Sequence, residues 1–132
     1  HDLLDFPDYY AETGVIPTPL DELLSASDVV TLHLPLNATT RHFLTAEHLR
    51  RMRPDAVLIN AARGGLVDET ALKTLLKSGH LGGGGLDVIA DGPPQGRELV
   101  GLANRMVTPH VGGSTGGAVV NMGRAAVRGL DD

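Results

Sequence analysis

Three side chains that could do chemistry, Arg63, Asp87 and His110, each stand at the end of a short apolar segment typical of a buried strand. The planar fork of an arginine matches a carboxylate, and a histidine can move a proton near neutral pH. Together these two are the minimum set for chemistry on a 2-hydroxy or 2-keto acid. If the strands are parallel, their carboxyl ends share one edge of a sheet, and the three side chains can converge there.

Arg63 and His110 each have a structural alternative. Arg63 stands before Gly64 and Gly65 on a tight loop, and a loop arginine can equally form a surface ion pair. A single histidine is more often structural than catalytic, so His110 alone would carry no assignment. The joint placement of the three side chains at expected strand ends is what favours a functional site.

The elements that must position these side chains alternate along the chain. Apolar segments rich in β-branched residues predict four strands, at Val29–Leu34, Ala56–Ile59, Leu86–Val88 and Met106–Thr108. Helical patterns lie before, between and after them, at Leu20–Ala26, Thr45–Arg51, about 69–77 and about 117–130, with a further helical turn at Leu99–Ala103. No two-residue hairpin signal is present. This alternation predicts an α/β fold with a parallel sheet.

Local signals predict where two of the helices begin and end. Thr45 is expected to cap the helix that follows it, and Asp68 the next one along the chain. Gly79 is expected to end that second helix. The glycines of Gly82–Gly85 weaken a strand, so we interpret them as a close approach of helix and strand. By contrast, residues 1–18 show no convincing period.

The composition excludes several classes of function. The 132 residues form at most one domain, and the net charge of −5 disfavours nucleic acid or an anionic membrane as a partner. With 0 cysteines and scattered histidines, neither a disulfide nor a metal site is expected. Because no signal peptide or membrane span is visible, the default location is cytoplasmic. The sequence begins His1-Asp2 rather than with Met, so we suspect a fragment.

An ordered set of motifs resembles the D-isomer-specific 2-hydroxyacid dehydrogenases, with some leaning toward the phosphoglycerate dehydrogenases. The motifs are Leu20–Leu24, His33–Leu36 with Thr40-Arg41, Ile59–Asp68, Gly79–Leu81 with Leu86–Val88, and Thr108–Thr115. The similarity runs from Asp2 to about Arg124, in the family's order and near its spacing. It implies an incomplete Rossmann-type doubly wound parallel sheet with flanking helices. Residues 1–132 would form a single partial NAD-binding domain.

The resemblance also implies a role for each site residue. Arg63 is similar to the arginine that binds the substrate's carboxylate and carbonyl, and His110 to the acid/base beside the nicotinamide. Asp87 resembles the aspartate near the nicotinamide carboxamide. Asp2 resembles the ribose-binding carboxylate that favours NAD over NADP, although it could also be an exposed terminal residue. The other expected cofactor-binding residues are Leu34, Pro35, Ala61, Gly112 and Gly113.

Two departures from the family pattern matter. The family usually has a glutamate that pairs with the histidine at the position occupied here by Gly92, and Asp91 is shorter and one residue out of register. Without a carboxylate partner, protonated His110 is less favoured, so keto-acid reduction is expected to shift to lower pH. The glycine-rich phosphate loop with its βαβ start, and the substrate domain, are missing from this sequence. Residues 1–132 alone are therefore expected to bind NAD poorly and to be inactive.

The resemblance implies an oxidoreductase that transfers a hydride between NAD(H) and C2 of a small D-2-hydroxy or 2-keto acid, as a homodimer when full length. Two alternatives stay open, a non-enzymatic NAD-sensing or corepressor-like relative and an inactive truncated fragment. The acid itself is not readable from this chain. Phosphoglycerate, glyoxylate or hydroxypyruvate, and lactate are candidates, with a slight lean to the first from Gly112–Thr115.

Overall fold

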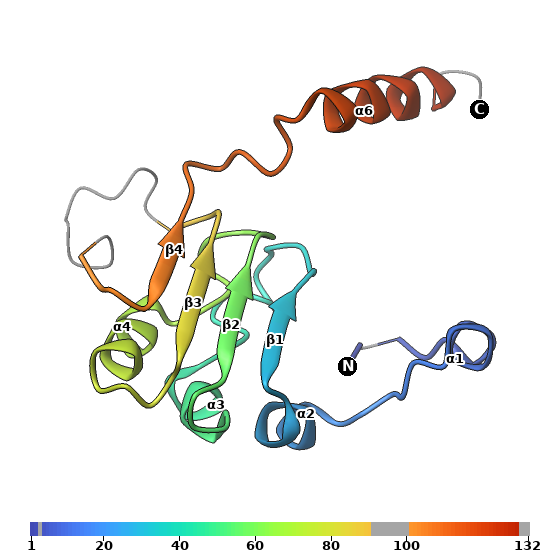
Figure 1. Ribbon diagram of the computed structural model, residues 1–132. Helices are drawn as coiled ribbons and strands as arrows, with labels where there is room; N and C mark the ends of the chain where they lie inside the picture. Colours follow the sequence, from blue (N-terminus) through green and yellow to red (C-terminus); the bar gives the residue numbers. More distant parts are fainter. Residues whose placement is uncertain (3, 91–100, 130–132) are drawn as a thin grey trace.

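A four-stranded parallel sheet with the order β1-β2-β3-β4 forms the centre of the molecule (Figure 1). The computed structural model describes residues 1–2, 4–90 and 101–129. The strands are β1 (Val29–Leu32), β2 (Val57–Asn60), β3 (Gly83–Leu86) and β4 (Arg105–Val107). The α/β class and the parallel sheet predicted from the alternation are confirmed. All four carboxyl ends point to one edge, at the top of Figure 1.

The helices are α1 (Pro7–Thr13), α2 (Leu20–Ala26), α3 (Ala46–Arg51), α4 (Glu69–Lys77) and α6 (Gly116–Arg128). Both predicted caps are confirmed. The Thr45 side chain accepts a hydrogen bond from the His48 amide at 3.3 Å, and Asp68 accepts one from the Ala71 amide at 2.9 Å. Gly79 follows α4 with a φ of +73°, a left-handed conformation that suits glycine.

Helix α1 is an element that the sequence does not predict. It begins at Pro7, has no buried residue and ends at Thr13, before the cap residue Gly14, whose φ is +72°. A helix without a buried face leaves no apolar period in the sequence. Figure 1 shows α1 lying apart from the sheet, beyond the free edge of β1.

The third strand begins earlier than expected. The sequence predicts it at Leu86–Val88, but β3 covers Gly83–Leu86 and pairs with β2 and β4 through backbone hydrogen bonds that need no side chains. The close helix approach expected for this glycine run is present at Gly84. A methyl group there would lie 3.2 Å from Cδ1 of Leu76 on α4.

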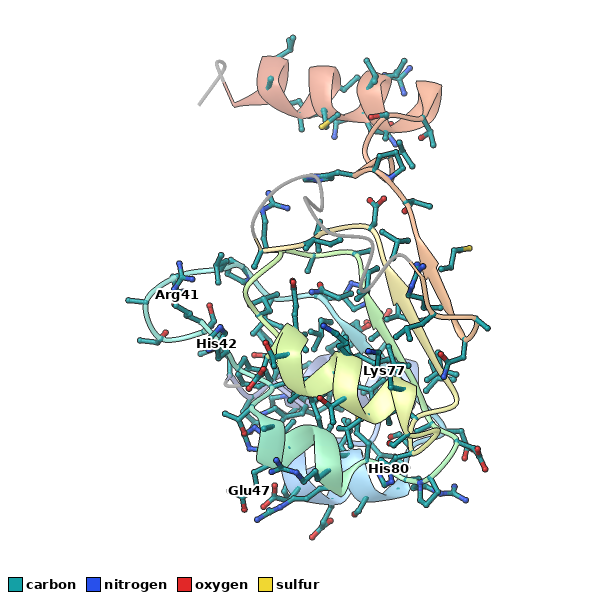
Figure 2. All side chains as sticks on the ribbon, turned by 90° about the vertical axis from the view of Figure 1, so that its left-hand side faces the viewer. Arg41, His42, Glu47, Lys77 and His80 are labelled. Atoms are coloured by element: carbon teal, nitrogen blue, oxygen red, sulfur yellow. The ribbon has the colours of Figure 1, made fainter. Side chains whose placement is uncertain are left out.

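One face of the sheet packs against α2, α3 and α4, which Figure 2 shows on a single side of the strands. The sheet residues of this core are Val30, Leu32, Leu58 and Leu86, and the helices contribute Leu24, Leu49, Leu72 and Leu76. The opposite face exposes apolar side chains, including 55% of Val29, 37% of Ile59 and 69% of Met106. Helix α6 has no buried residue and leads away from the sheet (Figure 1). Across the described ranges, no helix is both long and apolar enough to cross a membrane.

Candidate active site

Arg63 lies on the loop that leaves the carboxyl end of β2. Its guanidinium is exposed and donates one hydrogen bond, from Nη1 to the carbonyl of Ala62 at 2.7 Å. Arg63 takes no part in the ion pairs that Arg51 and Arg53 form with carboxylates in the described part of the chain. Most of the donors of this guanidinium are therefore free to bind an anion.

The buried side chain of Asn60 shapes this loop, and sequence reasoning missed it. Asn60 is the last residue of β2 and only 2% exposed. Its Nδ2 donates to the carbonyl of Arg63 at 3.0 Å, while its Oδ1 accepts from the amide of Ala62 at 3.1 Å. A buried amide needs such partners, because an unpaired one is costly. The available signal was a polar residue directly after an apolar strand.

Gly64 brings the Arg63 loop into contact with the segment that follows β3. A methyl group at Gly64 would lie 2.2 Å from the carbonyl carbon of Ile89 and 2.5 Å from the amide nitrogen of Ala90. Both atoms belong to the backbone, so neither can move aside as a side chain could. Glycine is required here because two backbones approach each other.

Replacing Gly64 with alanine should lower the free energy of unfolding by about 2–3 kcal/mol, because the methyl group has no space. Gly123→Ala is the matched control, since nothing lies within 4 Å of a methyl group at that position in α6. Urea unfolding of both variants gives the comparison. Equal stability of Gly64→Ala and the wild type would contradict the close approach.

Asp87, the first residue after β3, holds the turn that carries His110. Its Oδ1 accepts hydrogen bonds from Thr108 Oγ1 at 2.5 Å and from the Val111 amide at 2.9 Å. Its Oδ2 accepts from the Gly112 amide at 2.9 Å. These donors lie on both sides of His110, whose φ of +56° is left-handed and uncommon for a residue with a side chain. One carboxylate thus stabilises a strained turn beneath an exposed imidazole.

The hydrogen bond from Thr108, followed by those from the Gly112 and Val111 amides, holds the pKa of Asp87 below its usual range. A lowered pKa in the folded state means that ionised Asp87 stabilises the fold. This contribution is complete above the unfolded-state value of about 4, and it is lost as the pH falls through the lower folded value.

The wild type should therefore lose stability more steeply below about pH 4 than Asp87→Asn, which has no carboxylate to protonate. Urea unfolding at closely spaced pH values between about 2 and 6 measures the two slopes. Thr108→Val, which removes the hydroxyl donor at similar volume, should give an intermediate slope. Identical slopes for the wild type and Asp87→Asn would show that the folded protein does not favour the ionised carboxylate.

The structure places most of the other expected cofactor-binding residues at the same edge. Leu34 and Pro35 follow β1, Ala61 follows β2, and Gly112 and Gly113 follow β4.

Asp2 follows none of the four strands. It lines a surface hollow of about 320 Å³ with Asp5, Tyr10 and Pro17–Pro19, among others, and its Oδ1 accepts a hydrogen bond from the Leu4 amide at 3.0 Å. Asp91 and Gly92 lie outside the described residues, as do Leu99 and Val100 of the expected turn. Among the described residues, no group of three or more histidine, aspartate or glutamate side chains could hold a metal ion.

Comparison with known proteins identifies the family. A family model described as "D-isomer specific 2-hydroxyacid dehydrogenase, NAD binding domain" matches residues 5–112. The chain belongs to this family. The family's nucleotide-binding domain accounts for the parallel sheet and for the position of the loops at its carboxyl edge.

Among its relatives, the chain is 46% identical over 107 residues to glycerate dehydrogenase of Methylorubrum extorquens, covering 79% of this chain and 33% of that protein. A solved glyoxylate reductase from Paecilomyes thermophila superposes with a TM-score of 0.86 at 35% identity, covering 97% of this chain and 38% of that one. A D-isomer specific 2-hydroxyacid dehydrogenase from Xanthobacter autotrophicus Py2, in complex with NADPH and MES, superposes with a TM-score of 0.67 at 42% identity. The match covers 70% of this chain and 38% of that one. The chain spans about a third of the length of the curated relatives it matches.

Proposed function

We propose that the protein catalyses hydride transfer between a nicotinamide dinucleotide and C2 of a small D-2-hydroxy or 2-keto acid. The main support is the placement of Arg63, Asp87 and His110 in the segments that leave the carboxyl ends of β2, β3 and β4, at one edge of a parallel sheet. Ligands of open α/β sheets bind at this edge. Membership of the dehydrogenase family points to the same chemistry.

In this function, the chain's own side chains bind the acid and move a proton. The Arg63 guanidinium would bind the substrate carboxylate and polarise the neighbouring carbonyl oxygen. His110 would donate a proton to that oxygen during reduction and accept it from the hydroxyl during oxidation. Bound nicotinamide would supply or accept the hydride at C2.

The carboxyl edge has groups that fit a nicotinamide dinucleotide. A carboxylate offers about four acceptor sites, of which Asp87 uses three for Thr108, Val111 and Gly112. The remaining site suits an N–H of the nicotinamide carboxamide. A methyl group at Gly113 would meet nothing within 4 Å, so the backbone there is open to a ligand. Leu34, Pro35 and Ala61 would contact the rest of the cofactor.

NAD rather than NADP is the proposed cofactor. The support is Asp2, because a carboxylate beside the adenine ribose would repel a 2′-phosphate. In the present structure Asp2 lines a surface hollow with Tyr10 and Pro17–Pro19. One solved relative holds NADPH. The dissociation constants of NADH and NADPH test the choice, and we expect the lower value for NADH.

The proposed substrate is a two- or three-carbon acid, in keeping with relatives named glycerate dehydrogenase and glyoxylate reductase. We further propose that the protein is a homodimer, which light scattering of the purified complete gene product would test. We also propose that it is cytoplasmic, which cell fractionation would test. The net charge of −5 is the reason for expecting no nucleic acid partner.

The test of function is an assay of the complete gene product with glyoxylate, hydroxypyruvate, pyruvate and 3-phosphohydroxypyruvate, each with NADH and with NADPH. We expect oxidation of NADH with at least one of these acids at a kcat of about 1 s⁻¹ or more. A protein that binds NADH but reduces none of the acids would instead be a nucleotide-sensing relative. Failure to bind either nucleotide would contradict the proposal entirely.

A further inference from the structure

The loops that carry Arg63 and His110 are joined by a continuous series of hydrogen bonds. The buried Asn60 side chain bonds the backbone of Ala62 and Arg63 at 3.1 and 3.0 Å. The Asn60 carbonyl accepts a hydrogen bond from the Asp87 amide at 3.0 Å. The Asp87 carboxylate then holds the His110 turn through its three donors. The series runs across the ends of three neighbouring strands.

A second contact holds the Arg63 loop against the segment that follows β3. The backbone at Gly64 approaches that of Ile89 and Ala90 so closely that a methyl group would lie 2.2 Å from the Ile89 carbonyl carbon. The Arg63 loop is thus attached to the segment after β3 on both sides of Arg63. Before Arg63, the Asp87 amide donates to the Asn60 carbonyl, and after Arg63, the backbone of Gly64 lies against that of Ile89 and Ala90. Such a loop has little freedom to move relative to Asp87.

We propose that Asn60 is a positioning residue, which sets the Arg63 guanidinium relative to the His110 imidazole through its bonds to the Arg63 loop and to Asp87. This inference rests on the proposed function, because it concerns the distance between the two side chains that would act on the acid. Asn60 itself touches no substrate in this role. Its effect on turnover comes from geometry, and a misplacement of about 1 Å can cost about 100-fold in rate.

Kinetics of the complete gene product provide the first test. Asn60→Ala should lower kcat/KM for the keto acid about 100-fold while leaving the KM for NADH within about twofold. In an Arg63→Ala background, adding Asn60→Ala should lower kcat/KM for the keto acid by less than about threefold, because there is no guanidinium left to position. Asn60→Ser, whose hydroxyl can still accept from the Ala62 amide, should fall between Asn60→Ala and the wild type.

Asn104→Ala is the matched control. The Asn104 side chain also ties loops together, donating from Nδ2 to the carbonyls of Leu76 at 3.1 Å and Leu81 at 3.3 Å, but it does so at the amino end of β4. Its loss should reduce stability and leave kcat/KM within about threefold. If Asn60→Ala and Asn104→Ala lower kcat/KM equally, or if the Asn60 and Arg63 losses multiply, Asn60 acts through general stability and the positioning role is wrong.

Amide hydrogen exchange gives a readout that does not depend on activity. In Asn60→Ala, the amide of Ala62 should exchange about fivefold faster, because it loses its bond to the Asn60 Oδ1. The amide of Asp87 should keep its exchange rate, because it bonds the backbone carbonyl of Asn60, which the substitution leaves in place. Asn104→Ala should leave both amides unchanged. If the wild type reduces no keto acid, the proposed function fails and the exchange result still decides whether Asn60 connects the two loops. If the wild type is active and Asn60→Ala leaves the exchange of the Ala62 amide unchanged, the positioning role of the Asn60 side chain is refuted.

Discussion

His110→Gln is expected to lower kcat for keto-acid reduction by about 10³-fold, because proton transfer to the substrate oxygen is lost. A glutamine can hold a hydrogen bond at this position but cannot supply a proton. The turn beneath it should persist, since Asp87 holds the backbone amides of Val111 and Gly112 and the hydroxyl of Thr108. The KM for NADH should therefore change little. Steady-state kinetics with the best acid from the substrate panel, over a range of pH, would measure both effects.

His80→Gln is the matched control for this loss. The His80 ring contacts the carbonyl of Met52 at 3.1 Å, and Figure 2 shows the residue at the end of the molecule opposite to α6. The variant should keep kcat within about twofold of the wild type. If His110→Gln retained the wild-type kcat and pH profile, another group would supply the proton and the role given to His110 would be wrong.

Arg63→Lys should reduce kcat/KM for the keto acid by about 10²-fold or more, even though the positive charge remains. The ammonium group cannot reproduce the paired N–H donors that match a carboxylate, nor polarise the carbonyl from the same position. Arg63→Ala should lower kcat/KM for the keto acid further, because no positive charge is left at this position. In both variants the dissociation constant for NADH should stay close to the wild-type value, since the loss concerns the acid.

Arg53→Lys provides the comparison for Arg63→Lys. Arg53 pairs with Asp28 at 2.7 Å, near the amino ends of the strands, and is exposed like Arg63. Its replacement should leave kcat/KM unchanged within about twofold. Two results would argue against the role of Arg63: an unchanged KM for the acid in Arg63→Ala, or an equal loss in Arg53→Lys.

Short-range signals allowed the sequence to predict much of the fold. Thr45 and Asp68 cap α3 and α4 through amides three residues along the chain, so the relevant contacts are visible in a short stretch of sequence. The β-branched strands and the helical patterns between them were enough to predict a parallel sheet. Helix α1 escaped prediction because it buries no side chain and so leaves no apolar period.

The supports of the candidate site were less predictable because they depend on long-range contacts. Asp87 bonds donors 21 to 25 residues further along the chain, and nothing near Asp87 in the sequence indicates them. Gly64 is required by the backbone of Ile89 and Ala90, which the strand pairing brings beside it. Asn60 differs, because its side chain bonds residues only two and three positions along the chain, and its sequence signal is a polar residue at the end of an apolar strand. Its backbone link to Asp87 follows only from the strand pairing. The sequence pattern therefore predicts where the loops lie, whereas the contacts that hold them in place are visible only in the structure.

The most direct measurement is a crystal structure of the complete gene product with NADH and oxamate, an unreactive analogue of a small keto acid. We expect the Arg63 guanidinium to bind the oxamate carboxylate and the His110 imidazole to lie within hydrogen-bond distance, about 3 Å, of the oxygen that stands for the keto group. Side chains on opposite sides of the ligand pocket, or too far apart for one small acid to contact both, would contradict the dehydrogenase site described for this chain.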